Sequence, residues 1–417
     1  MAGQPTRTKR EADYLGLSIP PCGEFEVATT SISSPPWLQS GFNIDGTRSS
    51  KTVTVPSLSK EIEYFMNYMN PSPKEIAIRK DLVKRFTALI ETFDENITVI
   101  PVGSYVTGLY LPTSDIDMVL TRRNQSYNTS VRTIYPAIAR SGFASKVVTV
   151  FNASVPVIKV TDKVTGIEID ISNAESQSIK ATNAVAKWLQ TDTDIIRMLV
   201  FVVKTFLMIR RCGTTFTGGI NSYVLVWMVV AWVNLEWPKR KQTSVIHSSR
   251  ARNISSLEES LKNLSLLPAG TTPFVSNSTA SMPRPSTTKT QDASQYYAEA
   301  LKGFLDFYAQ KFDYRNMTIR IEPSPHYAVK PYVYSSYPTN FFLLSIFDPA
   351  NGGIDMGSKV YGINHIKASF REAYSTIISA ESAIGRGGIL GRMLGGDFTK
   401  FIERRADITR KGNHTQS

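Results

Sequence analysis

Hydrophobic residues recur with helical spacing after the first 56 residues of the chain. One face of a predicted helix carries Ile62, Phe65, Met66 and Met69. A second helix is predicted to begin after Ser72, because residues 72–75 read Ser-Pro-Lys-Glu, a capping box with proline at the first helical position. The apolar stripe of this second helix is Leu82, Phe86, Leu89 and Ile90. We expect residues 57–90 to pack as helices on a helical central domain.

The pattern then changes to short β-branched and alternating runs. These runs predict strands at residues 97–100, 115–120, 146–151, 155–161 and 167–171, forming a mixed sheet within residues 91–180. Helical spacing returns in residues 181–237 and again in residues 295–380, interrupted near residues 317–321 by a strand-like segment. This order of elements predicts an α+β fold, in which a small mixed sheet is followed by a helical domain.

Three segments lack this periodicity. Residues 1–56 are rich in Ser, Thr and Pro, and we expect them to be mostly disordered. Residues 238–294 form a predicted flexible Ser/Thr-rich insertion, with one short amphipathic patch at Leu257, Leu261 and Leu264. Residues 381–417 are Gly-rich and basic, and from Gly385 onward we expect a loose tail.

Composition narrows the class of protein. The 417 residues carry a formal net charge of +12, which favours a polyanionic partner such as nucleic acid. The two cysteines are too few for a disulfide framework or a cysteine-based zinc site. The polar, basic start does not resemble a secretory signal. The longest apolar stretch, residues 223–233, is well short of the ~20 residues that cross a bilayer, so we expect a buried core helix and no membrane association.

A pair of carboxylates carries the main chemical signal. Asp115 and Asp117 project from one face of a predicted strand, while Ile116 and Met118 point to the opposite face. Two carboxylates ~7 Å apart on one strand repel each other unless a cation lies between them. Oxygen ligands of this kind suit Mg²⁺, which also binds substrate phosphates.

A third carboxylate and a turn complete the pattern. In the strand at residues 167–171, Asp170 points away from the face formed by the isoleucines and joins the aspartate pair if the two strands are neighbours. Asp170 is our candidate to help activate an attacking hydroxyl in a two-metal mechanism. Gly103 and Ser104 follow a strand and enter a short helical turn, an arrangement that favours contact with phosphate oxygens.

The arrangement Gly-Ser, then Ser-Asp-x-Asp, then a later strand aspartate resembles the DNA polymerase β-like nucleotidyltransferase superfamily. Residues 107–117, 203–207 and 217–223 resemble the non-canonical poly(A) polymerases of the TRAMP-complex type, as do Asp348-Pro349 and Tyr361-Gly362. The resemblance covers roughly residues 57–380, apart from the insertion. It implies a small catalytic palm at 91–180, a helical central domain, and an active site in the cleft between them.

The resemblance also implies roles for individual residues. It assigns metal binding and catalysis to Asp115, Asp117 and Asp170. It assigns nucleotide binding to Gly103, Ser104, Ser178, Lys204, Ser222 and Tyr223. In this assignment the Lys204 ammonium and the Ser222 hydroxyl contact phosphate, and the Tyr223 ring stacks on the base. From the residues alone, Lys204 could equally be a helix lysine whose ammonium extends to solvent. Tyr223 could equally be an aromatic residue of the core.

The chain departs from the family pattern where base and ribose are recognised. Gln177-Ser178 stands where the family usually has Asn-Gly, and a serine there resembles the threonine of uridylyl-adding relatives. Ile354, Asp355 and Ser358 stand in the loop that usually reads Asn-Asp-Val-Gly-Arg. Ile354 has no side-chain hydrogen-bonding group, and discrimination between bases needs paired polar groups. We therefore expect selectivity for the nucleotide base to be either weaker than in the family or directed to another base.

These observations predict a template-independent polymerase that adds AMP from ATP to RNA 3′ ends, with two Mg²⁺ or Mn²⁺ ions. The alternatives are a terminal uridylyltransferase or mixed-tailing enzyme, and an inactive scaffold that binds RNA or partner proteins. Since the sequence contains no RNA-recognition motif, the resemblance implies that RNA binds in the groove between domains or through a partner, such as the RNA-binding protein or helicase of a TRAMP complex. It further implies a nuclear location, with cytoplasm as the other compartment.

Overall fold

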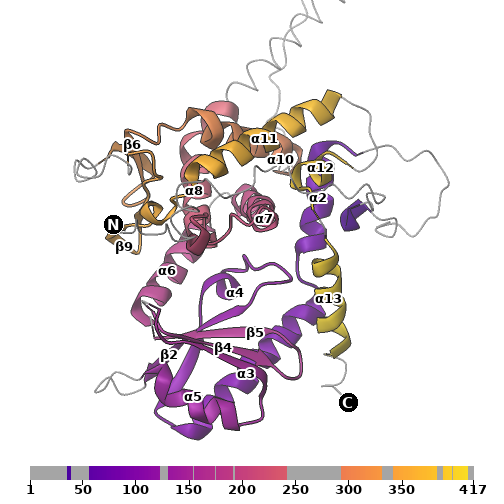
Figure 1. Ribbon diagram of the computed structural model, residues 1–417. Helices are drawn as coiled ribbons and strands as arrows, with labels where there is room; N and C mark the ends of the chain where they lie inside the picture. The colour runs from indigo at the N-terminus through magenta and orange to yellow at the C-terminus, as the bar shows by residue number, and fades with distance from the viewer. Residues whose placement is uncertain are drawn as a thin grey trace, which may run out of the picture.

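The described residues form two lobes, a sheet packed against helices and a larger helical bundle (Figure 1). The computed structural model describes residues 35–38, 56–122, 130–153, 155–173, 175–190, 193–241, 293–330, 341–382, 388–396 and 398–411. Within these ranges, no helix is both long enough and apolar enough to cross a membrane. The α+β class predicted from the sequence is confirmed.

The first lobe is built on a five-stranded mixed sheet. In sequence order its strands are β1 (Ile97–Pro101), β2 (Ile116–Arg122), β3 (Ala144–Val150), β4 (Val157–Asp162) and β5 (Glu168–Ser172). Their spatial order is β1-β2-β5-β4-β3, with β2 and β5 parallel and the other pairs antiparallel. Each strand predicted here is present, with no end displaced by more than two residues.

Helices on the two faces of this sheet decide which strand residues are exposed. The helices α3 (Pro73–Phe93) and α5 (Val131–Arg140) bury their apolar stripes against β2, β4 and β5 to form the palm core. The predicted capping box begins α3, with the side chains of Ser72 and Glu75 each accepting from the other's backbone N–H. The short helix α4 (Gly103–Thr107) and the helix α6 (Glu175–Trp188) pack together beside β2. The acidic side chains of β2 and β5 emerge on the face away from the palm core.

The second lobe is a bundle around one very apolar helix. Its long helices are α2 (Leu58–Met69), α7 (Thr193–Ile209), α8 (Ser222–Leu235), α10 (Tyr297–Asp306) and α11 (Ile363–Ser382). Residues 224–233 of α8 are all buried, which confirms the prediction of a core helix. Alpha-helix α10 continues into a π-helical turn, Phe307–Lys311.

Smaller elements of the helical lobe lie near the cleft and at its periphery. Two hairpins are formed by β6 (Met317–Arg320) with β7 (His326–Val329), and by β8 (Phe347–Asp348) with β9 (Asn351–Asp355). Short 3₁₀ turns occur at η2 (Thr215–Thr217), η3 (Ala293–Tyr296) and η7 (Gly357–Lys359).

Residues 57–90 were expected to pack as helices on the central domain, but α3 packs on the palm instead, while α2 packs in the helical lobe. Helix α2 buries Ile62 and Phe65 in the core of the helical lobe. Helix α3 buries Leu82 and Phe86 in the palm core instead. Both helices have an apolar stripe, and the stripe alone does not specify which core receives it.

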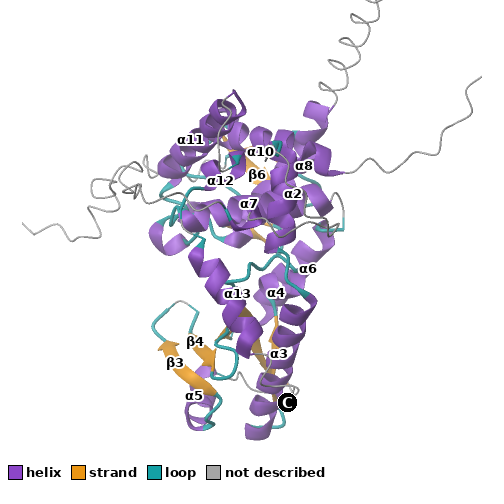
Figure 2. Cartoon of the chain, turned by 90° about the vertical axis from the view of Figure 1, so that its right-hand side faces the viewer, coloured by secondary structure: helices purple, strands orange, loops and turns teal. Residues whose placement is uncertain are grey.

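The prediction of a loose tail after residue 385 is also wrong for most of its residues. The tail contains α12 (Ile389–Leu394) and α13 (Thr399–Lys411). Helix α12 buries Leu390 and Leu394 in the helical lobe, and Ile408 of α13 reaches the palm core. Both views show α13 running alongside α3 (Figures 1 and 2). The tail is rich in Gly and basic residues and has few apolar ones, so its sequence does not predict helices. Tertiary packing of those few apolar residues stabilises the helices.

The N-terminal region and the insertion fall largely outside the described residues. Within residues 1–56, the short turn η1 (Pro36–Leu38) buries Trp37, whose indole donates to the buried carboxylate of Glu61, so this part of the region is packed. Residues 237–241, which include the start of the predicted insertion, are helical. The amphipathic patch predicted at Leu257 lies outside the described residues.

Candidate active site

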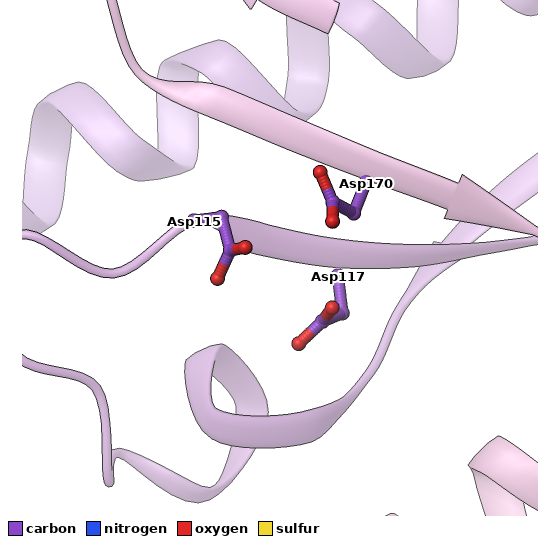
Figure 3. A group of neighbouring side chains, drawn as sticks. All are labelled: Asp115, Asp117 and Asp170. Atoms are coloured by element: carbon purple, nitrogen blue, oxygen red, sulfur yellow. The ribbon is translucent and has the colours of Figure 1, made fainter. Parts of the chain in front are cut away.

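Three aspartates meet where β2 and β5 run side by side. These strands pair in parallel with Asp117 directly opposite Asp170, and Asp115 immediately precedes β2. One carboxylate oxygen from each residue lies within 4.8 Å of the other two. Figure 3 shows the three side chains gathered along the two strands. The structure therefore brings together the three residues that the motif singled out.

Strand alternation explains why these side chains face the cleft. Ile116 and Met118 on β2, and Ile169 and Ile171 on β5, are buried in the palm core. Burying those four apolar side chains fixes the register of both strands, because a shift by one residue would reverse every side chain. The intervening carboxylates are consequently held on the opposite face.

Crowding and burial raise the affinity of this site for positive charge. Burial, and then the neighbouring Asp115 and Asp170, raise the pKa of Asp117 to about 7, partly offset by Lys204 and Lys159. Burial also raises the pKa of Asp170, against a hydrogen bond from Lys159. Oδ1 of Asp170 is buried and accepts no hydrogen bond from the described residues. Hard oxygen donors with an unused lone pair fit a divalent cation such as Mg²⁺ or Mn²⁺.

A glycine loop borders the three carboxylates. Gly103 begins α4 with a φ angle of +67°, and the neighbouring Val102 N–H donates to the Asp117 carbonyl at 2.9 Å. The Gly103 N–H donates to Thr182 Oγ1 at 2.9 Å, and that hydroxyl donates to the Ser178 carbonyl at 2.7 Å. The N–H of Gly103 is thus already paired, and the phosphate contacts expected of Gly103 and Ser104 stay predictions.

A cleft of about 540 Å³ opens between the palm and the helical lobe. The palm contributes Asp115, Ser114 and Glu168, and the helical lobe contributes Lys204 and Ser222. The remaining lining residues are Leu111, Thr113, Leu207, Met208, Arg211, Gly213, Thr214, Thr217, Ile220 and Leu225. The predicted phosphate-contacting residues Lys204 and Ser222 therefore share a cleft with a predicted metal ligand.

Lys204 is held by a contact with the palm, and Ser222 by the capped start of its helix. The Lys204 Nζ donates to the Leu109 carbonyl at 3.1 Å. Burial lowers the pKa of Lys204 to about 8, against the opposing influence of Asp115 and Asp117. Ser222 is the first residue of α8, directly after Asn221, whose side chain caps the helix by accepting from the Val224 N–H at 2.9 Å. The N-terminus of this helix favours anionic groups.

Tyr223 is partly buried and is held by neighbouring side chains. Its hydroxyl donates to Asp348 Oδ1 at 2.8 Å, and its ring meets Trp227 edge-on at a centroid distance of 5.7 Å. Burial and the Asp348 carboxylate raise the pKa of Tyr223 well above its ordinary value. Tyr223 is not among the residues that line the cleft, and its role in base stacking stays a prediction.

The loop proposed for base recognition lies in the β8–β9 hairpin and the turn after it. The Asp355 carboxylate accepts from the Ser345 hydroxyl at 2.6 Å and from the Ile346 and Gly357 N–H groups at 3.0 and 2.9 Å. Asp355 therefore stabilises the loop itself. Ile354 is 41% exposed, and Ser358 is exposed and donates to the Asp355 carbonyl at 2.8 Å. Ile354, Asp355 and Ser358 are not among the described residues that line the cleft.

Two cations near the aspartates, Lys159 and Arg79, were not predicted from the sequence. Lys159 on β4 forms an ion pair with Asp170, its register partner on β5. Alternation along β4 places Lys159 on the carboxylate face, but only the sheet order shows that β4 neighbours β5. Arg79 on α3 is 1% exposed and donates to the carbonyls of Pro112 and Ser114 at 3.2 and 2.9 Å. It holds the loop that ends at Asp115, and no local sequence signal marks it.

The chain is similar to known poly(A) RNA polymerases. Residues 58–190 match the family model described as the central palm domain of mitochondrial-like poly(A) RNA polymerase. The chain is 26% identical over 323 residues to the poly(A) RNA polymerase cid14 of Schizosaccharomyces pombe, an alignment that covers 77% of this chain and 40% of the relative. It is 32% identical over 180 residues to poly(A) RNA polymerase protein 2 of Saccharomyces cerevisiae, an alignment that covers 43% of this chain and 31% of the relative. The chain thus spans less than half the length of these two relatives.

A relative of similar length is named as inactive, and solved structures share the fold. The chain is 26% identical to the inactive poly(A) RNA polymerase protein Trf4-2 of Drosophila melanogaster, over 81% of this chain and 73% of the relative. The polymerase core of TRAMP, an RNA surveillance complex, has a TM-score of 0.58 at 22% identity and covers 85% of this chain and 94% of that one. The Cid1 poly(U) polymerase has a TM-score of 0.57 at 17% identity, and the match covers 82% of this chain and 98% of that one.

The matched palm domain lies where the three aspartates are found, and the shared fold extends over both lobes. Together these similarities confirm the resemblance to the poly(A) polymerases of the TRAMP-complex type that the motifs indicated.

Proposed function

We propose that this chain is a template-independent RNA nucleotidyltransferase that adds AMP from ATP to RNA 3′ ends. The observation that carries the proposal is the gathering of Asp115, Asp117 and Asp170 within 4.8 Å, at a cleft that also holds Lys204 and Ser222. Carboxylates that gather metal ions beside groups that bind phosphate are the parts that nucleotidyl transfer requires.

In this proposal, different residues of the cleft bind the metal ions and the triphosphate. Asp115, Asp117 and Asp170 would hold the divalent cations, which would supply activation of the RNA 3′-hydroxyl and neutralisation of the leaving pyrophosphate. Lys204 places a positive charge beside Asp115, where it attracts the triphosphate. Ser222 offers a hydroxyl at the start of α8, where the helix dipole favours phosphate. Mg²⁺ is the ion we expect in the cell, and Mn²⁺ fits the same oxygen ligands.

A second candidate is a terminal uridylyltransferase or mixed-tailing enzyme. The observation that favours it is the state of the β8–β9 loop, where Ile354 presents an apolar side chain and the Asp355 carboxylate is occupied by its own loop. Such a loop offers few free polar groups for telling one base from another. An inactive scaffold, the third reading, accounts poorly for the complete set of aspartates.

One assay separates these candidates. The purified chain is given a labelled RNA primer, Mg²⁺ and each of the four nucleoside triphosphates separately, beside an Asp117→Ala variant. The proposal predicts longest products with ATP and none with the variant. Predominant extension with UTP rejects the adenylyl assignment in favour of the second candidate. No extension with any nucleotide in Mg²⁺ or Mn²⁺ rejects both and leaves the scaffold.

We further propose that the chain acts with a partner that binds RNA, such as an RNA-binding protein or a helicase, and that it does so in the nucleus. The support is the resemblance to the polymerase of TRAMP together with the absence of an RNA-recognition motif in the sequence. Extension by the purified chain alone that equals extension in a cell extract from its source would argue against the need for a partner.

A further inference from the structure

A lysine occupies the edge of the aspartate cluster on the side away from β2. Lys159 on β4 lies opposite Asp170 in the β4–β5 register, and its Nζ forms an ion pair with Oδ2 of Asp170. The Lys159 side chain is 42% exposed and that of Asp170 is 17% exposed. The ammonium therefore reaches the carboxylate from the open face of the sheet.

This ion pair has an electrostatic reason. Three carboxylates within 4.8 Å repel one another, and an ammonium at one of them relieves part of that repulsion. Burial lowers the pKa of Lys159, but the hydrogen bond to Asp170 and the charges of Asp170, Asp115 and Glu168 together raise it above its ordinary value. Oδ1 of Asp170 is buried without a hydrogen-bond partner among the described residues, so Lys159 engages only half of the carboxylate.

The same contact opposes a divalent cation. An ion bound through the unpaired Oδ1 of Asp170 would be repelled by the Lys159 ammonium that sits on Oδ2 of the same carboxylate, and an ion bound through Oδ2 would compete with that ammonium directly. Asp115 and Asp117 are not paired with Lys159 in this way, because they lie across β5 from it. The competition therefore falls on Asp170 more than on the other two ligands.

We propose that Lys159 is a positioning residue that holds Asp170 before metal binding and weakens the binding of the ion that depends on Asp170. That ion becomes firmly bound when the phosphates of the RNA 3′ end draw the ammonium away. This inference rests on the proposed function, because it assumes that the aspartates bind two ions and that RNA is the acceptor. It adds an order of binding in which RNA completes the metal site.

Lys146 provides a matched control. It lies on the neighbouring strand β3, is exposed, and has Thr161 as its register partner. Lys146→Met removes the same charge from the same sheet without removing the ion pair to Asp170. Lys159→Arg keeps a cation beside Asp170 and should behave like the wild type.

The test measures Mn²⁺ binding to the full chain by electron paramagnetic resonance, without nucleotide and then with a short RNA. We expect Lys159→Met to tighten the weaker Mn²⁺ site by roughly tenfold, a change equivalent to ~1.4 kcal/mol. We expect Lys146→Met to change it by less than roughly threefold, as for a charge that acts only from a distance. RNA should tighten the weaker site by a larger factor in the wild type than in Lys159→Met, because only the wild type has an ammonium on Asp170 for the RNA phosphates to draw away.

The opposing results are distinct. Equal tightening in Lys159→Met and Lys146→Met would mean that general charge, and not the ion pair, sets the affinity. Weaker binding in Lys159→Met would mean that the lysine supports the ion. Either result overturns this inference and leaves the proposed function standing if the wild type still extends RNA. A wild-type chain that binds no Mn²⁺ would overturn both.

Discussion

The backbone of Gly103 lies directly against the carboxylate of Asp117. A Cβ atom added to Gly103 would stand 2.9 Å from Oδ2 of Asp117, and the φ angle of Gly103 is +67°. Only glycine adopts this left-handed conformation routinely and leaves room for the carboxylate. The turn that begins α4 is thus fitted to one of the three aspartates.

Gly103→Ala should displace Asp117 and weaken metal binding. We expect extension of RNA to fall by about tenfold or more, because small displacements of catalytic groups have large effects on rate. Gly142→Ala is the matched control, since Gly142 has a φ angle of +71° and an added Cβ would meet nothing within 4 Å. Both variants carry a backbone strain of about 1–2 kcal/mol. Equal RNA extension by the two variants would contradict the fit described here.

Asp117 should make the metal-free protein less stable as the pH rises. Its pKa is raised in the folded chain from 3.8 to about 7, so the folded state holds the proton more tightly than the unfolded state between these values. The resulting stability is present below pH 3.8 and is lost as the pH rises through about 7. Asparagine does not titrate, and Asp117→Asn should escape this loss.

Thermal melting in a chelator checks this prediction. We expect Asp117→Asn to melt about 2 °C or more above the wild type at pH 8, and the difference to shrink towards pH 4. Added Mg²⁺ should raise the melting temperature of the wild type and have little effect on the variant. A wild type that is the more stable protein at pH 8 without metal would show that Asp117 is not destabilised by its neighbours.

Arg79 should stabilise the fold through the loop that precedes Asp115. Arg79→Met would leave the carbonyls of Pro112 and Ser114 without their buried donor. We expect a loss of about 2–4 kcal/mol in the free energy of unfolding, as for removal of a buried charged donor. Arg79→Lys keeps the charge and should recover part of that loss in chemical denaturation. No measurable loss in Arg79→Met would mean that the loop is held by other contacts.

Lys204→Met should raise the KM for ATP. A charge-assisted hydrogen bond to phosphate contributes about 1.5–3 kcal/mol, so an increase of roughly tenfold or more is expected. Lys239→Met is the control, because Lys239 is a 68% exposed lysine of the same lobe that pairs with Glu236. Steady-state kinetics with a saturating RNA primer gives the comparison. Unchanged KM values in both variants would remove Lys204 from the nucleotide site.

Alternation along strands made the aspartate cluster predictable from the sequence. Ile169 and Ile171 must face a core, which turns Asp170 outward, and the same argument applies to Asp117 between Ile116 and Met118. The cluster also required β2 and β5 to be neighbours. That fact is a property of sheet order, and the family resemblance supplied it before the structure did.

Other parts could not be predicted, because they depend on contacts between distant segments. Trp37 is buried against Glu61 although its surroundings in sequence read as disordered. Helix α13 packs on α3 through Ile408, in a tail whose composition favours loop. Lys159 lies on the correct face of its strand, but nothing local shows that Asp170 is its partner.

The proposed function requires Asp115, Asp117 and Asp170 to hold the metal ions of nucleotidyl transfer. Its most direct test is a crystal of the chain with Mn²⁺ and a non-hydrolysable ATP analogue, examined by anomalous scattering at the manganese edge. We expect manganese peaks within about 2.0–2.4 Å of oxygens of the three aspartates, with the triphosphate beside Lys204 and Ser222. Manganese bound elsewhere, or nucleotide bound without metal at these residues, would contradict it.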